Sequence, residues 1–518
     1  MGNSACECRD NPRTWRQWVV DYSGQATLAL VTASLICFAN YKLFRVNDVD
    51  LCETDDSFEH CQEQRFLHAS LGGEISTGIP YRIFQVLPDV FDDELPENDA
   101  EGFRKFGFLR NDDPNLPLGF AKRLMGYERV TVNCALCHVS SYRFDSEETP
   151  KQALAGPAHT VDVQGYIEFL KTIADDNHVD RWGGRLLKAI DKRGSLSWYD
   201  KLIYRFILIP QTRSLLTRQA ESLAQVHDGR AVKGTVGWAV KGTTGRGDSI
   251  TRIKTGLLQK RRDGSPGFTD FPAIWNLEQR AGRPLYAGGE MRSIDDVMIG
   301  HALSLGAPPG PETKKRMADM RDYLGTRQAP KLIPALTEAG QDLILDIASV
   351  SRGKKIFEEE CQGCHGWNGE HAGEVVPVAE VGTDVERYNS WRHQHAVALN
   401  QMKAELGVES ELAAKTRGYV AKPLDGIWLR APYLHNGSVP SLTELLAPLK
   451  ERSEVFYRGC DIYDPMSMGF ASDGPSKACP AVTEFDTTEP GNSNGGHLYG
   501  TDLSSLKKQQ LIDYLRTL

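Results

Sequence analysis

The sequence lacks an excess of basic residues, and it lacks the compositional bias of disordered or low-complexity chains. Its 60 Lys and Arg are outnumbered by 69 Asp and Glu, so the net charge is −9. This balance argues against a nucleic-acid partner, which a basic surface would have to hold. Apolar residues make up 40% and charged residues 25% of the 518 residues. That is ordinary globular usage, and it excludes wholesale disorder.

Strand-like alternation of apolar and polar residues is also scarce. Helical spacing is more frequent, with apolar residues recurring at helix intervals over residues 161–173, 185–227 and 503–518. A stretch rich in Gly and Pro, residues 325–334, is typical of a linker between domains. The pattern therefore predicts a mostly α-helical chain with long loops.

One long uncharged run stands near the N-terminus. Residues 22–41 carry no Asp, Glu, Lys or Arg, and they have about the length that a membrane-spanning helix needs. Three arginines precede the run, which by the positive-inside rule leaves that end in the cytoplasm. A cleaved signal peptide and a buried helix are the alternatives, but Phe38-Ala39-Asn40 is a poor match to a cleavage site. We expect an uncleaved anchor that holds the rest of the chain at the periplasmic face of the inner membrane.

Four of the eleven cysteines form two spaced pairs. Cys52 and Cys61 are nine residues apart, and Cys460 and Cys479 are nineteen apart, in polar, turn-rich stretches. Such pairs commonly close as disulfides in an oxidising periplasm. Free thiols are the alternative, because bonding requires Cα atoms within reach and spacing alone does not show this.

Four other cysteines belong to two short motifs of the form Cys-x-x-Cys-His. These motifs consist of Cys134, Cys137 and His138, and of Cys361, Cys364 and His365. Cysteines three apart project from one side of a helical turn, so each sulfur can form a thioether with one porphyrin vinyl group. The histidine that follows then gives its imidazole to the iron. A thioredoxin-like pair needs no such histidine, and a zinc site needs further ligands nearby. The sequence therefore predicts two covalently bound c-type haems.

An internal repeat follows the two motifs. Aligning Pro284 with Pro432 places Gly289 on Gly437, and each copy follows its own motif. We expect each copy to pass over the far face of its haem. At the same aligned position the second copy offers His435, whereas the first has an alanine.

This difference predicts two unlike haems. An iron with two protein ligands exchanges electrons, and one with an open sixth position can bind peroxide or dioxygen. We interpret the haem of His365 as six-coordinate, with His435 opposite, and the haem of His138 as the reactive centre. Two alternatives stay open: His435 could be a hydrogen-bonded loop residue, and another histidine could fill the open position, with His159 ahead of His68 and His301.

Residues 423–440, with the sequence PLDGIWLRAPYLHNGSVP, resemble the bacterial di-haem cytochrome c peroxidase superfamily, which includes MauG-type enzymes. Within it, the chain is most similar to the rubber-oxygenase-like di-haem cytochromes. The resemblance covers roughly residues 70–518 and implies two cytochrome c-like helical domains that face each other. It also implies that the second axial ligand of the C-terminal haem falls on His435. Calcium between the domains is a further implication, for which no ligands can be assigned.

The first copy of the repeat departs from the family pattern. In peroxidases its loop carries a catalytic glutamine, which this sequence replaces with Leu285-Tyr-Ala-Gly-Gly289. The distal glutamate of the family falls on Asp295. Asp295 could relay protons, or it could support a helix that begins at Ser293. Tyr286 could donate a hydrogen bond on the distal side, or it could be a packed aromatic.

These observations together predict an organisation and a function. We expect a cytoplasmic tail (1–21), a transmembrane anchor (22–41), an N-terminal haem domain with insertions (50–325) and a C-terminal cytochrome c domain (340–518). The expected activity is a peroxidase- or oxygenase-like oxidoreductase. Its partners would be a small periplasmic electron-transfer protein, peroxide, O₂ or an unsaturated substrate. The alternative is an electron carrier in which both haems are six-coordinate.

Overall fold

The computed structural model describes most of the chain beyond the expected anchor. The described residues are Thr27, Ala33 and residues 45–48, 51–52, 57–110, 116–175, 180–224, 243–260, 265–405 and 411–518. The predicted tail and anchor fall outside them apart from Thr27 and Ala33. In the described ranges, no helix is both long enough and apolar enough to cross a membrane. Helix is the main regular structure there, as the sequence predicts.

A small antiparallel sheet opens the N-terminal half. Its strands lie in the order β1 (Val46–Asp48), β3 (Phe120–Met125), β4 (Tyr127–Val132) and β2 (Ile79–Pro80). Gly126 makes the turn between β3 and β4 with a φ of 71°, a conformation that side chains with a Cβ rarely adopt. The sequence analysis did not foresee this sheet.

Helices and short hairpins complete the N-terminal half. Its other elements up to the second haem motif are α2 (Phe58–His68), η1 (Gly73–Ile75), α3 (Tyr81–Val90), η2 (Asp92–Glu94), η3 (Gly102–Phe106), η4 (Cys134–Leu136), β5 (Val139–Tyr142), β6 (Lys151–Leu154), α4 (Val163–Asp175), η5 (Arg181–Arg185), α5 (Leu186–Arg193), α6 (Trp198–Ile203), η6 (Tyr204–Leu208), α7 (Ile209–Ala224), β7 (Arg246–Gly247), α8 (Ser249–Arg252), η7 (Ile253–Leu257), β8 (Thr269–Asp270), η8 (Glu278–Arg280), α9 (Ile294–Ser304) and α10 (Pro311–Gly325). The helical spacing noted over 161–173 and 185–227 thus corresponds to α4 and to the run from α5 to α7.

An aromatic core holds this half together. Its rings lie with centroids between 4.5 and 6.4 Å apart, and they belong to Phe84, Phe103, Phe106, Phe108, Phe120 and Tyr166. All six are buried. Burial of each such side chain stabilises the fold by about 2 kcal/mol.

The C-terminal half is built around two crossing helices. Its elements are α11 (Leu332–Glu338), α12 (Ile347–Glu360), α13 (Gln362–His365), β9 (Val375–Pro377), α14 (Val378–Val381), α15 (Glu386–Ser390), α16 (His393–Glu405), β10 (Gly418–Val420), η9 (Ile427–Arg430), α17 (Leu442–Leu445), η10 (Leu449–Glu451), β11 (Val455–Arg458), β12 (Tyr463–Asp464), β13 (Gly469–Phe470), β14 (Thr483–Asp486) and α18 (Ser505–Leu515). α12 packs against α18. At Gly353 an added Cβ would lie 1.8 Å from the carbonyl oxygen of Gln510. Only glycine permits so close a crossing.

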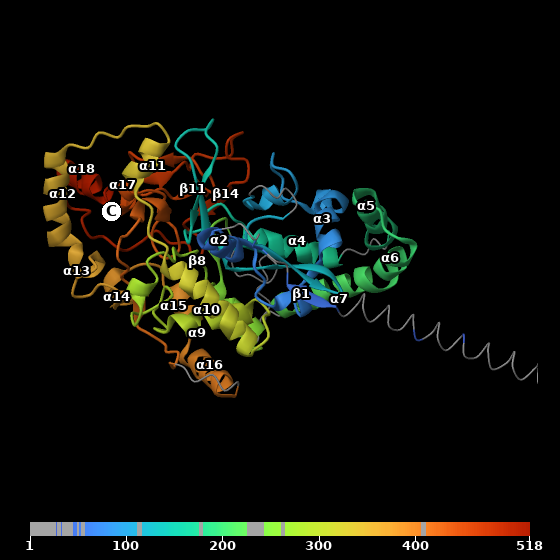
Figure 1. The fold of residues 1–518 in the computed structure, drawn as a ribbon. Coiled ribbons are helices and arrows are strands. Elements are labelled where there is room, and N and C mark those ends of the chain that lie inside the picture. The colour runs from blue at the N-terminus through green and yellow to red at the C-terminus, as the bar shows by residue number, and fades with distance from the viewer. Residues whose placement is uncertain are drawn as a thin grey trace, which may run out of the picture.

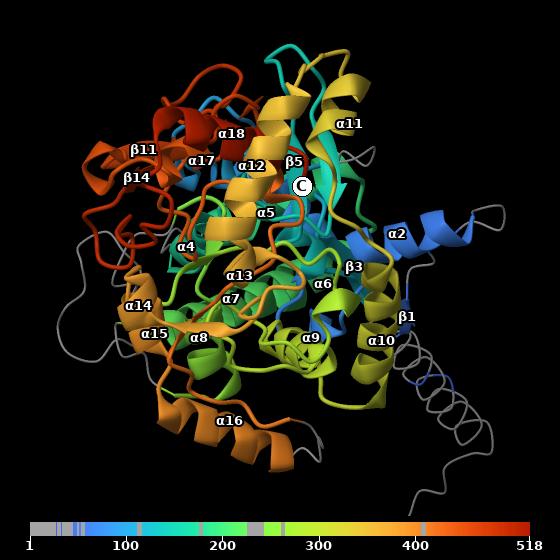
Figure 2. The same cartoon turned by 90° about the vertical axis from the view of Figure 1, so that its left-hand side faces the viewer.

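The two halves share a second hydrophobic core. It contains Trp275 from the N-terminal half and Trp428 from the C-terminal half, both fully buried. Cys134 and Cys361 pack against it from the two haem motifs. Figure 1 shows α12 and α18 at one end of the molecule and α5 and α6 at the other. In the turned view of Figure 2, α16 lies at the opposite edge from α11 and α18.

Two disulfides link the predicted pairs. Cys52 bonds to Cys61, with Cα atoms 5.1 Å apart, and Cys460 bonds to Cys479, with Cα atoms 5.0 Å apart. The Cα separations required for bonding are therefore present in both pairs.

Candidate haem sites

The first haem motif is anchored by the residue that precedes it. Asn133 caps η4 by accepting a hydrogen bond from the Ala135 N–H at 3.0 Å. Its side-chain amide donates to the carbonyls of Phe66 and Ala69 at the end of α2. Cys134 and Cys137 form no disulfide, and burial raises the pKa of both, that of Cys134 to about 11. Both sulfurs are therefore available for the thioether bonds that the motif predicts.

His138, the last residue of this motif, is oriented by a backbone carbonyl. Its Nδ1 lies 2.9 Å from the carbonyl oxygen of Pro272. Since a carbonyl only accepts, Nδ1 carries the proton, and Nε2 keeps the lone pair with which an imidazole binds iron. Burial lowers the pKa of His138 to about 4. The ring is therefore neutral at pH 7, as ligation requires.

The second motif has the same arrangement. Cys361 ends α12, and His365 closes the short helix α13 that follows. Nδ1 of His365 lies 2.8 Å from the carbonyl oxygen of Lys422, and burial lowers the pKa of this histidine. Both predicted axial histidines thus have one ring nitrogen fixed by the backbone and the other left for a metal.

The two copies of the repeat have matching backbones. The Leu285 N–H donates to the Met291 carbonyl at 2.7 Å, and the Tyr433 N–H donates to the Val439 carbonyl at 2.7 Å. Both pairs form isolated antiparallel bridges. These four residues coincide when Pro284 is aligned with Pro432, so the sequence repeat is also a structural one.

The unusual torsions of the two loops match as well. Positive φ values occur at aligned positions, at Tyr286 (63°) and Leu434 (72°), and at Gly289 (71°) and Gly437 (62°). The residue that follows the first strained position is Ala287 in one copy and His435 in the other. The structure therefore supports the alignment on which the predicted difference between the haems depends.

His435 is a buried imidazole with an unpaired nitrogen. Among the described residues its Nε2 has no hydrogen-bond partner, and its ring stacks on Tyr419 with centroids 3.9 Å apart. Burial lowers its pKa to about 3. A neutral ring with an orphaned nitrogen has the chemistry of a metal ligand. No measured contact joins it to His365, so its role as the opposing ligand stays a prediction.

His497 is a second candidate for that role, and the sequence analysis missed it. Its ring centroid lies 6.0 Å from that of His365, with the planes 45° apart. Two imidazoles that bind one metal from opposite sides, each with a nitrogen about 2 Å away, have centroids roughly 6 Å apart. Nδ1 of His497 lacks a partner in the described structure, and burial lowers its pKa to about 4. The available signal was Gly495-Gly496-His497, a histidine in a glycine loop just before the last helix, but no spacing tied it to His365.

Tyr286 and His301, both considered for the haem of His138, contact each other. The Tyr286 ring lies 5.4 Å from the ring of His301 on α9. Burial raises the pKa of Tyr286 and lowers that of His301 to about 4. A charge on His301 would also depress the pKa of His138. The structure thus brings Tyr286 and His301 together.

The other residues considered for this centre have different neighbours. Asp295 is half-exposed and forms an ion pair with Arg321 of α10 at 2.7 Å, which agrees with the helix-supporting alternative. His159 is buried, accepts or donates a hydrogen bond at Ser140 Oγ (3.1 Å) and stacks on Phe470. Nδ1 of His68 lies 3.1 Å from the Phe120 carbonyl. None of these three contacts involves a haem-motif residue.

A polar cluster joins the two centres. The Trp275 indole donates to the Asp425 carbonyl at 3.2 Å, and the Asp425 carboxylate pairs with Arg280 at 2.9 Å and with Arg430 at 2.8 Å. All three charged side chains are mostly buried. Trp275 lies three residues after Pro272, whose carbonyl orients His138. Asp425 lies three residues after Lys422, whose carbonyl orients His365. This cluster therefore fixes the two motifs relative to each other.

Two family models match the chain in its C-terminal half. A model described as RoxA-like, cytochrome c-like matches residues 418–457, and a cytochrome c model matches residues 350–429. With the site geometry above, these matches define a c-type cytochrome that carries covalently bound haem. More narrowly, it is related to RoxA-like cytochromes.

Two relatives come from Sinorhizobium fredii (strain NBRC 101917 / NGR234). The uncharacterized protein y4iJ is 29% identical over 242 residues, which cover 34% of this chain and 39% of the relative. The uncharacterized protein y4iM is 27% identical over 259 residues, which cover 44% of this chain and 56% of the relative. The chain thus matches about half or less of the length of these relatives.

Proposed function

We propose that the chain is an exported di-haem c-type cytochrome that acts as an oxidoreductase. One haem would be held by His365 with a second histidine opposite. The other would be held by His138 alone and would keep an axial position for peroxide or O₂. When bound, haem supplies electron transfer and, where a position is open, activation of such ligands.

The observation that carries this proposal is the closeness of the His497 ring to the ring of His365. His159, His435 and His497 each have a buried ring nitrogen without a hydrogen-bond partner among the described residues, and the last two belong to the C-terminal half. At the position aligned with His435, the first copy has a methyl group, Ala287. The ring of His497 lies 6.0 Å from the ring of His365. This separation supports His497 over His435 as the second ligand of that haem.

Tyr286 and His301 would serve the open position. The Tyr286 hydroxyl, kept protonated by its raised pKa, can donate a hydrogen bond to a bound oxygen species. His301 is neutral at pH 7, so it can take up a proton or pass one on. Asp295 remains a weaker candidate because its carboxylate is engaged by Arg321.

A non-catalytic electron carrier is the second candidate function. His301 is itself a buried neutral imidazole near the first centre. If it binds the iron, both haems would be six-coordinate and no reactive position would remain.

Two observations support the proposed export: the two disulfides, which are typical of an oxidising compartment, and the predicted anchor at residues 22–41. We propose the periplasmic face of the inner membrane as the location. A small periplasmic electron-transfer protein would then be the electron donor, with peroxide, O₂ or an unsaturated molecule as substrate. In the described residues, one group of three side chains brings possible metal-ligand atoms within 4.8 Å of one another: Cys460, Asp461 and Cys479. The disulfide between its two cysteines leaves it unsuited to the calcium ion considered above.

Carbon monoxide binding tests the proposal. Addition to the ferrous protein should change the absorption of about one haem in two, because only an open iron takes the ligand. No spectral change would favour the electron carrier.

Substitution of the two histidines tests the ligand assignment. His497→Ala should convert the low-spin ferric haem to high-spin, whereas His435→Ala should leave it low-spin. The exposed His393→Ala on α16 is the matched control. A high-spin conversion by His435→Ala instead would restore the assignment made from the repeat.

A further inference from the structure

A helix at one end of the molecule exposes large apolar side chains. Trp198, Leu202 and Phe206 on α6 and η6 are 75%, 49% and 67% exposed. They are four residues apart, so they lie on one helical face, which we call the α6 stripe. Tyr204 and Leu208 on the other face are buried. An exposed stripe of this kind marks an interaction surface.

The segment around the α6 stripe is strongly basic. Residues 181–220 contain nine Lys and Arg and two Asp, a net of +7, in a chain whose overall charge is −9. Both aspartates are engaged, since Asp191 pairs with Lys201 at 2.8 Å and Asp200 accepts from the Tyr127 hydroxyl at 2.7 Å. Lys188, Lys192 and Arg205 are exposed. Arg181 and Arg193 pair with Asp93 and Asp89 of neighbouring segments, so it is these three exposed cations that fit an anionic partner.

The α6 stripe lies beside the point where the chain enters the described structure. Arg45 accepts a hydrogen bond from the Gly126 N–H at 2.6 Å, and the next residue, Tyr127, is the one bonded to Asp200 on α6. Arg45 is four residues beyond the last residue of the predicted span, a distance of at most about 14 Å. A bilayer crossed by that span would lie within reach of α6, which Figure 1 shows at the end of the molecule opposite α12 and α18.

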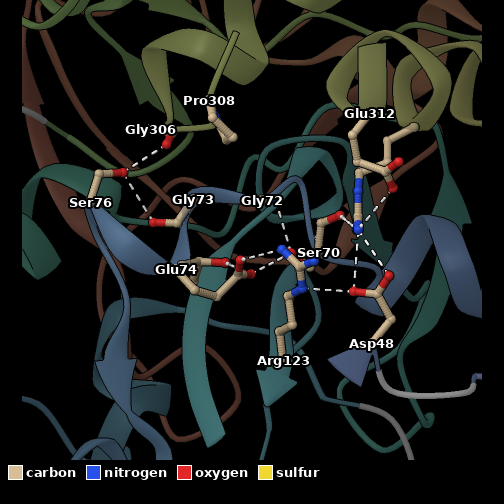
Figure 3. A network of polar contacts seen from close by, with 12 residues as sticks. Asp48, Ser70, Gly72, Gly73, Glu74, Ser76, Arg123, Gly306, Pro308 and Glu312 are labelled. Carbon is tan, nitrogen blue, oxygen red and sulfur yellow. Dashed lines mark hydrogen bonds and ion pairs between the residues drawn. The ribbon is translucent and has the colours of Figure 1, made fainter. Parts of the chain in front are cut away.

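Ion pairs fix this entry point to the body. The Asp48 carboxylate of β1 pairs with Arg123 at 2.7 Å, as Figure 3 shows. It also pairs with Arg316 of α10 at 2.9 Å. Arg123 also lies 3.7 Å from Glu74, which is fully buried and accepts from the Ser70 hydroxyl. β1 is thus held against both the sheet and α10, so Arg45 keeps a set position relative to α6.

We propose that the α6 stripe and its basic surroundings dock on the surface of a bilayer that contains anionic phospholipids. Trp, Leu and Phe insert at the level of the headgroups, and Lys and Arg contact the phosphates. An acidic protein could pair with the basic residues. It would not explain why Trp198 and Phe206 are exposed close to the segment that leads from the predicted membrane span. Docking would fix the orientation of both haem motifs above the membrane. The docking proposal does not depend on the proposed oxidoreductase activity.

Hydrogen–deuterium exchange of the full-length haem-loaded protein in lipid nanodiscs tests this inference. Peptides covering residues 198–208 should exchange at least about threefold more slowly in discs of phosphatidylcholine with phosphatidylglycerol than in discs of phosphatidylcholine alone. Peptides from α18 should not change. The double variant Trp198→Ser with Phe206→Ser should lose the effect, and Leu506→Ser, an equally exposed site on α18 (68%), should retain it.

Two results would overturn the proposal. One is equal exchange of residues 198–208 in the two kinds of disc. The other is slowing that requires an added acidic electron-transfer protein and ignores phosphatidylglycerol. A separate measurement tests the predicted anchor. If residues 22–41 do not span the bilayer, a salt wash should release the protein from phosphatidylcholine discs. The lipid-dependent exchange of α6 could still be measured on discs with phosphatidylglycerol.

Discussion

Substitution of Gly353 by alanine tests the helix crossing that supports the second haem motif. The added Cβ would lie 1.8 Å from the Gln510 carbonyl oxygen and 2.9 Å from Cβ of Tyr514. A carbon and an oxygen normally approach to a little over 3 Å, so α12 and α18 would have to separate by more than 1 Å along this line. The obstacle is backbone, which cannot rotate away as a side chain does.

The expected cost follows from two opposing effects. Overpacking costs roughly 1 to 3 kcal/mol, and more where backbone must shift, whereas replacing a helical glycine with alanine gains about 1 kcal/mol. We expect Gly353→Ala to lower the free energy of unfolding by about 2 kcal/mol, which is roughly a thirtyfold change in the unfolding equilibrium. Gly300→Ala on α9 is the matched control, because its Cβ would meet nothing within 4 Å, and it should gain stability. Guanidinium chloride titration followed by circular dichroism measures both. An unfolding midpoint for Gly353→Ala at or above that of the parent protein would refute the crossing.

Three further predictions concern charge, pH and cross-linking. Asp425→Ala should cost about 3 kcal/mol in denaturant titrations, since it leaves two mostly buried arginines without their counter-ion; a loss below about 1 kcal/mol would contradict this. Burial lowers the pKa of His159 from its ordinary 6.5 to about 3, so stability should fall as pH drops from 6.5 toward 3. The free energy of unfolding should be roughly 2 kcal/mol lower at pH 5 than at pH 7.5 because of this histidine. In denaturant titrations of His159→Phe, the difference between the two pH values should be smaller by about that amount. Replacing Cys460 and Cys479 with serine opens a loop of 19 residues and should cost about 3 kcal/mol, seen as a lower Tm.

The two Cys-x-x-Cys-His motifs were predictable because their spacing is local. Cys134 and His138, like Cys361 and His365, form their sites within one turn of chain, so no tertiary information is needed. The repeat was also visible, and its bridges and torsions agree with the alignment. The sequence could not show which distant imidazole lies beside His365, because a tertiary contact holds His497 there: its backbone N–H donates to the Val381 carbonyl at 2.7 Å.

Tertiary contacts also decided two other outcomes. Asp295 matched a family carboxylate, yet Arg321 of α10 pairs with it, and no local pattern announces that neighbour. The four-stranded sheet was missed because β3 carries Lys122 and Arg123 at its centre, which breaks the apolar alternation. Arg123 is stabilised there by its pairs with Asp48 and Glu74.

Electron paramagnetic resonance of the ferric protein tests the difference between the two haems most directly. We expect one high-spin and one low-spin signal in equal amounts, from the centres of His138 and His365 respectively. Two low-spin signals and no high-spin signal would show that both irons have two protein ligands, and this would contradict the proposed function.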